Sequence, residues 1–197
     1  MMERQKIIII VSILVIFGTV TFSFLNIYAL EKLELSGIDN NFRFFVMSTD
    51  DKIKICNDSL LPANFNQFNI IIFYEDNVLG TFIVDTASIM PYSVLEVDGK
   101  YKSDSYAESQ ALFMTFDHML MGSSPTIRID PQKLDVITEF KTTIIGIPYS
   151  VTEQSTGFEF WNMLNDENNI KGEDVDKRKR LRTSMFVLVE TSNDIHD

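Results

Sequence analysis

Chemically reactive side chains are scarce in this sequence of 197 residues, which contains one cysteine, two histidines and one tryptophan. The single cysteine, Cys56, cannot form a disulfide within the chain. It lies in an alternating apolar stretch without a nearby histidine, so we interpret it as a small, semi-buried apolar residue rather than a nucleophile. His118 and His196 are far apart and have no metal-ligand spacing, which argues against a metal site.

Sequence motifs of enzymes and cofactor sites are also missing. The chain has no G-x-S-x-G, H-E-x-x-H, P-loop or G-x-G-x-x-G sequence. Asp117 and His118 are adjacent in an expected helix and so do not face each other as a catalytic pair would. We therefore expect no catalytic residues, no metal and no cofactor, and a protein that is not an enzyme.

Positive charge is in short supply, with 17 basic against 28 acidic residues and a formal net charge of −11. Nucleic-acid binding requires a cationic surface, so we expect no nucleic-acid partner. The hydrophobic fraction of 45% and the 16 phenylalanines provide enough apolar material for one ordered domain with a sizeable core.

One long apolar run is present, from Ile7 to Leu30, and it contains no charged residue. As a helix these residues would extend about 36 Å, enough to cross a bilayer core of about 30 Å. The later apolar stretch from Met185 to Val189 is far too short for a second span. The sequence therefore predicts a single transmembrane helix over residues 7–30.

The flanking charges predict the orientation of this helix. Arg4 and Lys6 precede it, which places residues 1–6 in the cytoplasm and the rest of the chain outside the cell membrane. A signal peptide cleaved after Ala29 is the alternative. The apolar run is longer than a signal core of roughly 7–15 residues, and Ile27–Ala29 is a poor cleavage site, so we favour an uncleaved signal anchor.

Short stretches of alternating or continuous apolar residues follow, separated by turn signals, and indicate a mainly β domain. Asp76–Asn77 is expected to form a two-residue hairpin turn. The stretch 68–74 is apolar on both faces, which places it in the centre of a sheet. The expected strands are 41–47, 52–57, 68–74, 78–84, 94–102, 126–130, 134–141, 143–151 and 184–190.

A change to helical spacing predicts one helix over residues 106–121. Ser105 and Glu108 form a capping-box sequence before it, and Gly122 provides a stop after it. The predicted organisation is a β-sandwich with one inserted helix over residues 31–164, an acidic and then basic loop over 165–183, and a terminal strand and tail over 184–197.

The region from Ile53 to Gly80 resembles the late embryogenesis abundant type 2 family (LEA14-like or WHy domain). In that family a strand ending in Asn is followed by a turn containing Pro, a long apolar strand and a Leu-Gly turn. The matching positions here are Ile55, Asn57, Pro62, 68–77, Leu79–Gly80 and the later stretch 143–151. This sequence departs from the pattern at Asn57–Asp58, where the family has Asn-Pro, and beyond Phe158.

The resemblance implies an immunoglobulin-like or fibronectin-like antiparallel sandwich without catalytic residues. It also implies roles in stress protection and, for membrane-anchored members, in lipid or surface association.

Three features are candidate sites. Asn57–Asp58–Ser59 is a possible glycosylation sequon. Phe158, Phe160 and Trp161 are either an exposed interaction surface or part of the core. A basic cluster could bind anionic headgroups or an acidic partner, or could simply balance the acidic residues before it. This cluster comprises Lys177, Arg178, Lys179, Arg180 and Arg182.

We therefore expect a membrane-anchored, extracytoplasmic module with a binding or structural role at the cell envelope. Its partners would be the membrane through the N-terminal helix, and envelope proteins, lipid or polysaccharide. Two alternatives remain: an adhesion or assembly module that adds a strand to a partner's sheet, and a lipid-carrying domain with an apolar cleft between helix and sheet.

Overall fold

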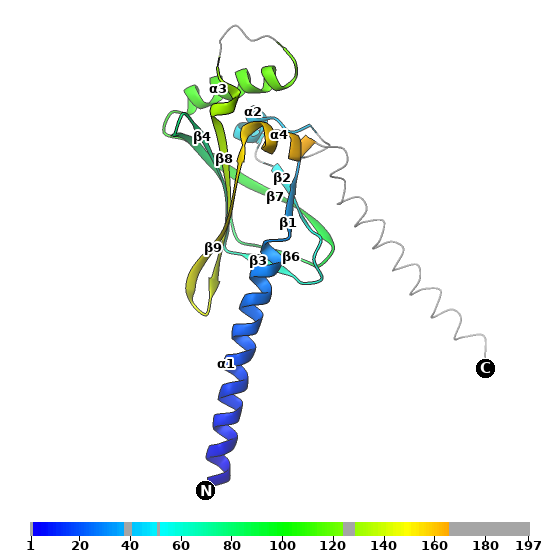
Figure 1. Ribbon diagram of the computed structural model, residues 1–197, viewed down its shortest axis with the longest axis vertical. Helices are drawn as coiled ribbons and strands as arrows, with labels where there is room; N and C mark the ends of the chain where they lie inside the picture. The colour runs from blue at the N-terminus through cyan, green and yellow to red at the C-terminus, as the bar shows by residue number, and fades with distance from the viewer. Residues whose placement is uncertain (1, 38–40, 51, 124–128, 166–197) are drawn as a thin grey trace, which may run out of the picture.

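The computed structural model describes residues 2–37, 41–50, 52–123 and 129–165, including the side chains of all but residues 2–5 and 50. The basic cluster 177–182, the expected terminal strand 184–190, His196 and most of the expected strand 126–130 lie outside these residues. Within them, a long N-terminal helix leads into a β-rich domain (Figure 1).

The N-terminal helix α1 (Met2–Leu30) confirms the helix that the apolar run predicts. Its segment Lys6–Leu30 is long and apolar enough to cross a membrane. Its apolar side chains are exposed along most of its length, as with Ile8 and Phe17, and only its last turn packs against the domain. Figure 1 shows α1 projecting from the domain at β3.

The main sheet is antiparallel and curled, with seven strands in the order β1-β2-β7-β5-β4-β8-β9. A second sheet pairs β3 with β6 beside α1. The strands are β1 (Leu33–Ser36), β2 (Lys52–Asn57), β3 (Ala63–Phe65), β4 (Gln67–Tyr74), β5 (Asn77–Val84), β6 (Ala87–Ile89), β7 (Ser93–Lys102), β8 (Leu134–Ile144) and β9 (Ile147–Thr156).

Strand β4 lies inside the sheet between β5 and β8, as its continuous apolar run predicts. Phe68, Ile70 and Ile72 on one of its faces are fully buried. Phe68 stacks on Phe140 of β8 with ring centroids 4.3 Å apart. The predicted half-buried strand β7 is likewise confirmed, with Val97 buried and Glu96 exposed.

Two hairpin turns differ from the sequence prediction. The β4–β5 turn is Glu75–Asp76, with φ of 50° and 66°, rather than Asp76–Asn77. The stretch 143–151, predicted as one strand, is a hairpin whose turn is Ile145–Gly146, with φ of 50° and 81°. Asparagine, aspartate and glycine suit such turns, and an isoleucine with positive φ does not, so no turn signal was present at residue 145.

Among the described residues, three α-helices (α2, α3 and α4) and a short 3-10 helix (Pro131–Lys133) accompany the sheet where the sequence predicted one helix. Figure 1 shows the three α-helices at the end of the domain opposite α1. Helix α3 (Tyr106–Leu120) is the predicted helix. It is followed by Gly122 with φ of 79°, but the Ser105 side chain makes no capping hydrogen bond. Helix α4 (Gly157–Asn165) packs against β1 and β8.

Helix α2 (Phe44–Asp50) replaces the strand predicted over 41–47. The backbone N–H groups of Phe44 and Phe45 donate to the two carboxylate oxygens of Asp117, at 3.0 and 2.9 Å. Asp117 is buried on α3, so a residue about seventy positions away holds the start of α2. The aromatic side chains that suggested a strand instead bury one side of this helix, with Phe44 and Met47 in the core.

The titration of Asp117 leads to a stability prediction. Burial raises the pKa of Asp117 to about 6, although hydrogen bonds from Phe45 and Phe44 and the charges of Arg43 and His118 act in the opposite direction. In the unfolded chain this carboxyl titrates near its ordinary value of about 4. The unfolded state therefore loses a proton first as the pH rises, and the folded state loses stability between about pH 4 and pH 6.

The quantity to follow is the unfolding free energy of the wild type minus that of the Asp117→Asn variant. We expect this difference to fall by at most roughly 3 kcal/mol between about pH 4 and pH 6 and to stay constant at higher pH. Denaturant unfolding of the full chain in detergent at several pH values measures it. Asp98→Asn, which removes an exposed carboxylate instead of the buried one, is the control substitution. A constant difference between wild type and Asp117→Asn would contradict the assignment.

Candidate functional site

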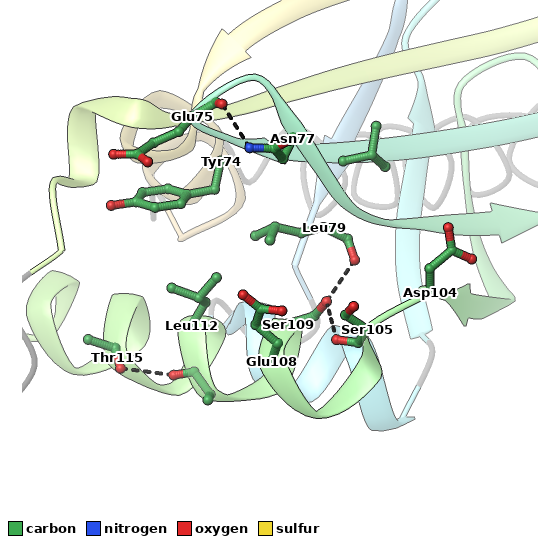
Figure 2. A pocket seen from close by; sticks show the side chains of 12 residues that line it. Tyr74, Glu75, Asn77, Leu79, Asp104, Ser105, Glu108, Ser109, Leu112 and Thr115 are labelled. Carbon is green, nitrogen blue, oxygen red and sulfur yellow. Dashed lines mark hydrogen bonds between the residues drawn. The ribbon is translucent and has the colours of Figure 1, made fainter.

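A groove lies between α3 and the β4–β5 hairpin (Figure 2). Helix α3 lies at the end of the domain away from α1 (Figure 1). Its volume is about 560 Å³. Leu112 of α3 points toward Tyr74 and Leu79 of the hairpin and gives the groove an apolar interior. The lining residues are Tyr74, Glu75, Asn77, Val78, Leu79, Asp104, Ser105, Glu108, Ser109, Ala111, Leu112 and Thr115.

The polar groups at one end of this groove bind one another. The carbonyl oxygen of Leu79 accepts hydrogen bonds from the hydroxyls of Ser103, Ser109 and Tyr101, at 2.5, 2.7 and 3.1 Å. Burial raises the pKa of Tyr101, which keeps its hydroxyl protonated as a donor. These bonds attach α3 to β5, and they leave the serines as structural groups without a general base beside them.

The rim of the groove is acidic. Glu75, Asp104 and Glu108 surround it, and Glu75 forms an exposed ion pair with Lys133. No three histidine, cysteine or acidic residues are grouped to hold a metal within the part of the chain that the structure describes. The groove can accept a small apolar or cationic group and would repel an anion.

A second polar cluster attaches α1 to the domain. The side-chain amide of Asn26 donates to the carbonyl oxygen of Asn64 at 2.9 Å and to the hydroxyl of Thr142 at 3.2 Å. Its carbonyl oxygen accepts from the backbone N–H of Asn64 at 2.8 Å. Ala29 and Leu30 beside it are fully buried. The helix is therefore docked on β3 and β8 by its last turn.

Sequence reasoning missed the role of Asn26, which it treated as a polar interruption of the apolar run. The available signal was its chemistry, because Asn26 is the single amide side chain in residues 7–30. A strong hydrogen-bonding group in such a segment usually faces a protein partner.

The three candidate aromatic residues of α4 have different environments. Phe160 is fully buried between Phe42 and Phe44 and cannot belong to an exposed surface. Trp161 is half-buried, and its indole N–H is buried without a hydrogen-bond partner. Phe158 is exposed. Phe160 is thus excluded from the candidate surface, whereas Phe158 and the half-buried Trp161 remain in it, and the basic cluster lies outside the described residues.

The side chain of Asn57, the candidate glycosylation site, is fully buried. Its Nδ2 atom donates to the carbonyl oxygens of Leu61 and Ile89, at 2.8 and 3.0 Å, and Oδ1 accepts from Ser59. A glycan on Nδ2 is incompatible with these two bonds in the folded domain. The residue instead joins the loop after β2 to the end of β6.

Cys56 and His118 agree with the interpretation that neither is reactive. Cys56 is buried in β2, and burial raises the pKa of its thiol to about 11, so the nucleophilic thiolate is scarce at neutral pH. His118 is exposed on α3 whereas Asp117 faces inward, so the two side chains point in different directions.

Comparisons with known proteins identify no family. No family model and no curated protein matches the chain. Two chains of solved structures match. One, described as "Crystal structure of protein from Archaeoglobus fulgidus", is 11% identical, with 63% of this chain and 94% of that chain covered and a TM-score of 0.28. Similarity at this level supports no conclusion about fold or function.

The buried amide of Asn57 leads to a second prediction. Asn57→Ala removes the Nδ2 donor to the carbonyl oxygens of Leu61 and Ile89 and the acceptor of Ser59, while Leu61 keeps a hydrogen bond from the Ser59 hydroxyl. We expect it to lower the unfolding free energy by about 1–3 kcal/mol. The control Asn66→Ala changes an exposed side chain one loop further on and should have an effect within about 0.5 kcal/mol. Chemical denaturation measures both. Equal effects of the two substitutions would contradict the structural role.

Proposed function

We propose that the chain is a non-enzymatic, membrane-anchored module with a binding or structural role at the cell envelope. The observation that carries this proposal is the docking of α1 through Asn26, because it makes the apolar helix an integral part of the folded domain. The helix holds the domain directly at the bilayer surface without a flexible linker. The groove between α3 and the β4–β5 hairpin then faces away from the membrane.

The length of the free part of α1 supports a membrane span. Residues 7–25 precede the docked turn, and their large apolar side chains are mostly exposed. As a helix they extend about 28 Å, which matches the thickness of a bilayer core. Such a surface in water would be unfavourable by its apolar area alone, and lipid is the environment that it fits.

The same docking argues against removal of the helix as a signal peptide. Cleavage after Ala29 would take away Asn26 and the buried Ala29. It would leave the N–H of Asn64 without its acceptor and open a gap beside β3. Retention as a signal anchor keeps these contacts. Arg4 and Lys6 support a cytoplasmic N-terminus, with the domain outside the cell.

The antiparallel sheet and the buried Asn57 loop are compatible with a sandwich of the late embryogenesis abundant type 2 kind. In this proposal the module associates with lipid or envelope proteins and contributes to stress protection. The groove supplies no activated nucleophile or metal site among the described residues, which favours binding over catalysis.

The anchor proposal predicts a specific protease pattern. Lys32 is exposed just after α1, but the docked turn holds the chain around it. In intact cells we expect external trypsin to digest the domain and to spare residues 1–30, while fractionation keeps the full chain in the membrane. Asn26→Leu should leave the chain in the membrane and increase cleavage near Lys32, because the N–H of Asn64 loses its acceptor.

The matched control is Ser12→Leu, which changes a polar side chain of α1 outside the docked turn. It should leave the rate of cleavage near Lys32 unchanged. A domain that stays intact in protease-treated cells, or a full-length chain in the soluble fraction, would contradict the proposal.

Strand addition is a second candidate, favoured by the position of β9. This strand pairs only with β8 within the described residues and forms one edge of the main sheet. Most of its side chains are exposed and only one is charged, Glu153. An unprotected edge of this kind can accept a further strand from a partner or from a second copy.

Lysines on β9 should block such pairing. We expect Thr152→Lys with Gln154→Lys to abolish crosslinks that a photoreactive residue at Ser150 forms in cell membranes. Asp98→Lys, on the exposed face of the internal strand β7, is the control and should leave the crosslinks intact. Persistence of the crosslinks in the double variant would exclude pairing at this edge.

A further inference from the structure

The tip of the β8–β9 hairpin is apolar, uncharged and exposed. Ile145 is 60% exposed, Ile147 is 68% exposed and Tyr149 is 42% exposed. No charged residue occurs between Lys141 and Glu153. Water is a poor environment for such a group of side chains on a turn, and an exposed apolar cluster of this kind indicates a contact surface.

The backbone conformation of the β8–β9 turn favours polar residues or glycine, so the presence of an isoleucine there calls for an explanation. Ile145 has a φ of 50°, a conformation that asparagine or glycine adopts easily and a β-branched residue adopts at a cost. The β4–β5 hairpin at the other end of the domain has Glu75 and Asp76 in the corresponding positions. Residues that break a local rule while exposed are expected where function requires them.

The location of this tip identifies what it contacts. Thr142, three residues before the turn, bonds to Asn26, which marks the end of the exposed part of α1. Figure 1 shows the hairpin continuing past β3 alongside α1, toward its N-terminal end. At about 3.3 Å per residue, the turn reaches up to roughly 10 Å beyond Thr142. If α1 crosses a bilayer, this distance places the tip in the interfacial layer and the edge of the hydrocarbon.

Two further exposed side chains lie at the same end of the domain. Leu60 is 72% exposed and Met90 is 64% exposed. Their loops are joined by Asn57, which pairs with Leu33 just after α1. These loops are thus near the level at which α1 enters the domain.

We infer that the β8–β9 tip, formed by Ile144, Ile145, Ile147 and Tyr149, is a second membrane contact that inserts into the bilayer crossed by α1. This inference rests on the proposed anchor function. Tyr149 is suited to the interface, where an aromatic ring can lie in the apolar layer and its hydroxyl in water. With two separate contacts, the tilt of the domain relative to the bilayer plane is restricted.

Depth-dependent fluorescence quenching tests this inference on the full chain in phosphatidylcholine vesicles. Single cysteines replace Ile147 at the tip, Asp76 at the opposite hairpin and Val15 in α1, in a Cys56→Ala background, and each carries an environment-sensitive fluorophore. We expect lipids with a nitroxide near the headgroup to quench the label at 147 and to leave the label at 76 unquenched. Emission at 147 should also be shifted to shorter wavelength.

The label at Val15 separates the two proposals and is read with lipids that carry a nitroxide deep in the acyl chain, because residue 15 lies near the middle of the span. Quenching at 15 without quenching at 147 would overturn the tip insertion and leave the anchor in place. Absence of quenching at both positions would overturn the anchor as well. A disulfide between two copies of the unlabelled Ile147→Cys variant, without lipid quenching of the labelled one, would show that the tip contacts a second chain instead of lipid.

Substitution of the turn distinguishes a membrane role from a packing role. With the fluorophore at Ser150, Ile145→Asn should reduce quenching toward the value at position 76 and leave the melting temperature unchanged or higher, because asparagine accepts this φ. Val78→Asn, an exposed apolar residue at the opposite end, is the control and should leave the quenching at 150 unchanged. A lower melting temperature with unchanged quenching would overturn the inference.

Discussion

The hydrogen bonds of Asn26 connect the two parts of this protein. An amide side chain in an otherwise apolar helix is unfavourable in lipid unless its polar atoms are paired. Here the partners are Asn64 and Thr142, so the helix and the domain satisfy each other's polar groups. The position of every other surface relative to α1 follows from this contact. The docked turn puts β3 and the β8–β9 hairpin near the helix, and it leaves α2, α3 and α4 at the far end.

The far end is held together by long-range contacts of a different kind. Asp117 on α3 accepts hydrogen bonds from the first backbone N–H groups of α2. The carbonyl oxygen of Leu79 accepts hydrogen bonds from hydroxyl groups of β7 and α3. In both arrangements the polar side chains are hydrogen-bonded within the protein, so they have structural roles. What remains open is a groove with an apolar interior and carboxylates around it. This arrangement is the basis for proposing recognition, rather than catalysis, as the role of the groove.

The sequence predicted those elements whose signals are local. The apolar run indicated α1, the two-faced apolar stretch indicated β4, and the change of period indicated α3. It did not reveal α2, because the carboxylate that holds its first turn comes from a residue about seventy positions later. It also did not reveal the Ile145–Gly146 turn, because isoleucine is unfavourable there. The candidate site residues were selected by the chemical type of their side chains. Chemical type alone could not show that Phe160 and Asn57 are buried, or that Asn26 joins α1 to β8.

The net charge of the domain bears on the two bilayer contacts that we propose, α1 and the β8–β9 tip. The chain after residue 30 carries 15 basic and 27 acidic residues, once Glu3, Arg4 and Lys6 are set aside. A body of this charge is repelled by anionic headgroups over about a Debye length. A helix with a flexible linker would therefore let the domain move away from the surface. A docked helix resists this movement, and an uncharged tip beside it is the part of the domain that can approach lipid without such repulsion. In this proposal, the acidic groove at the other end of the domain is held at a fixed height above the membrane and faces away from it.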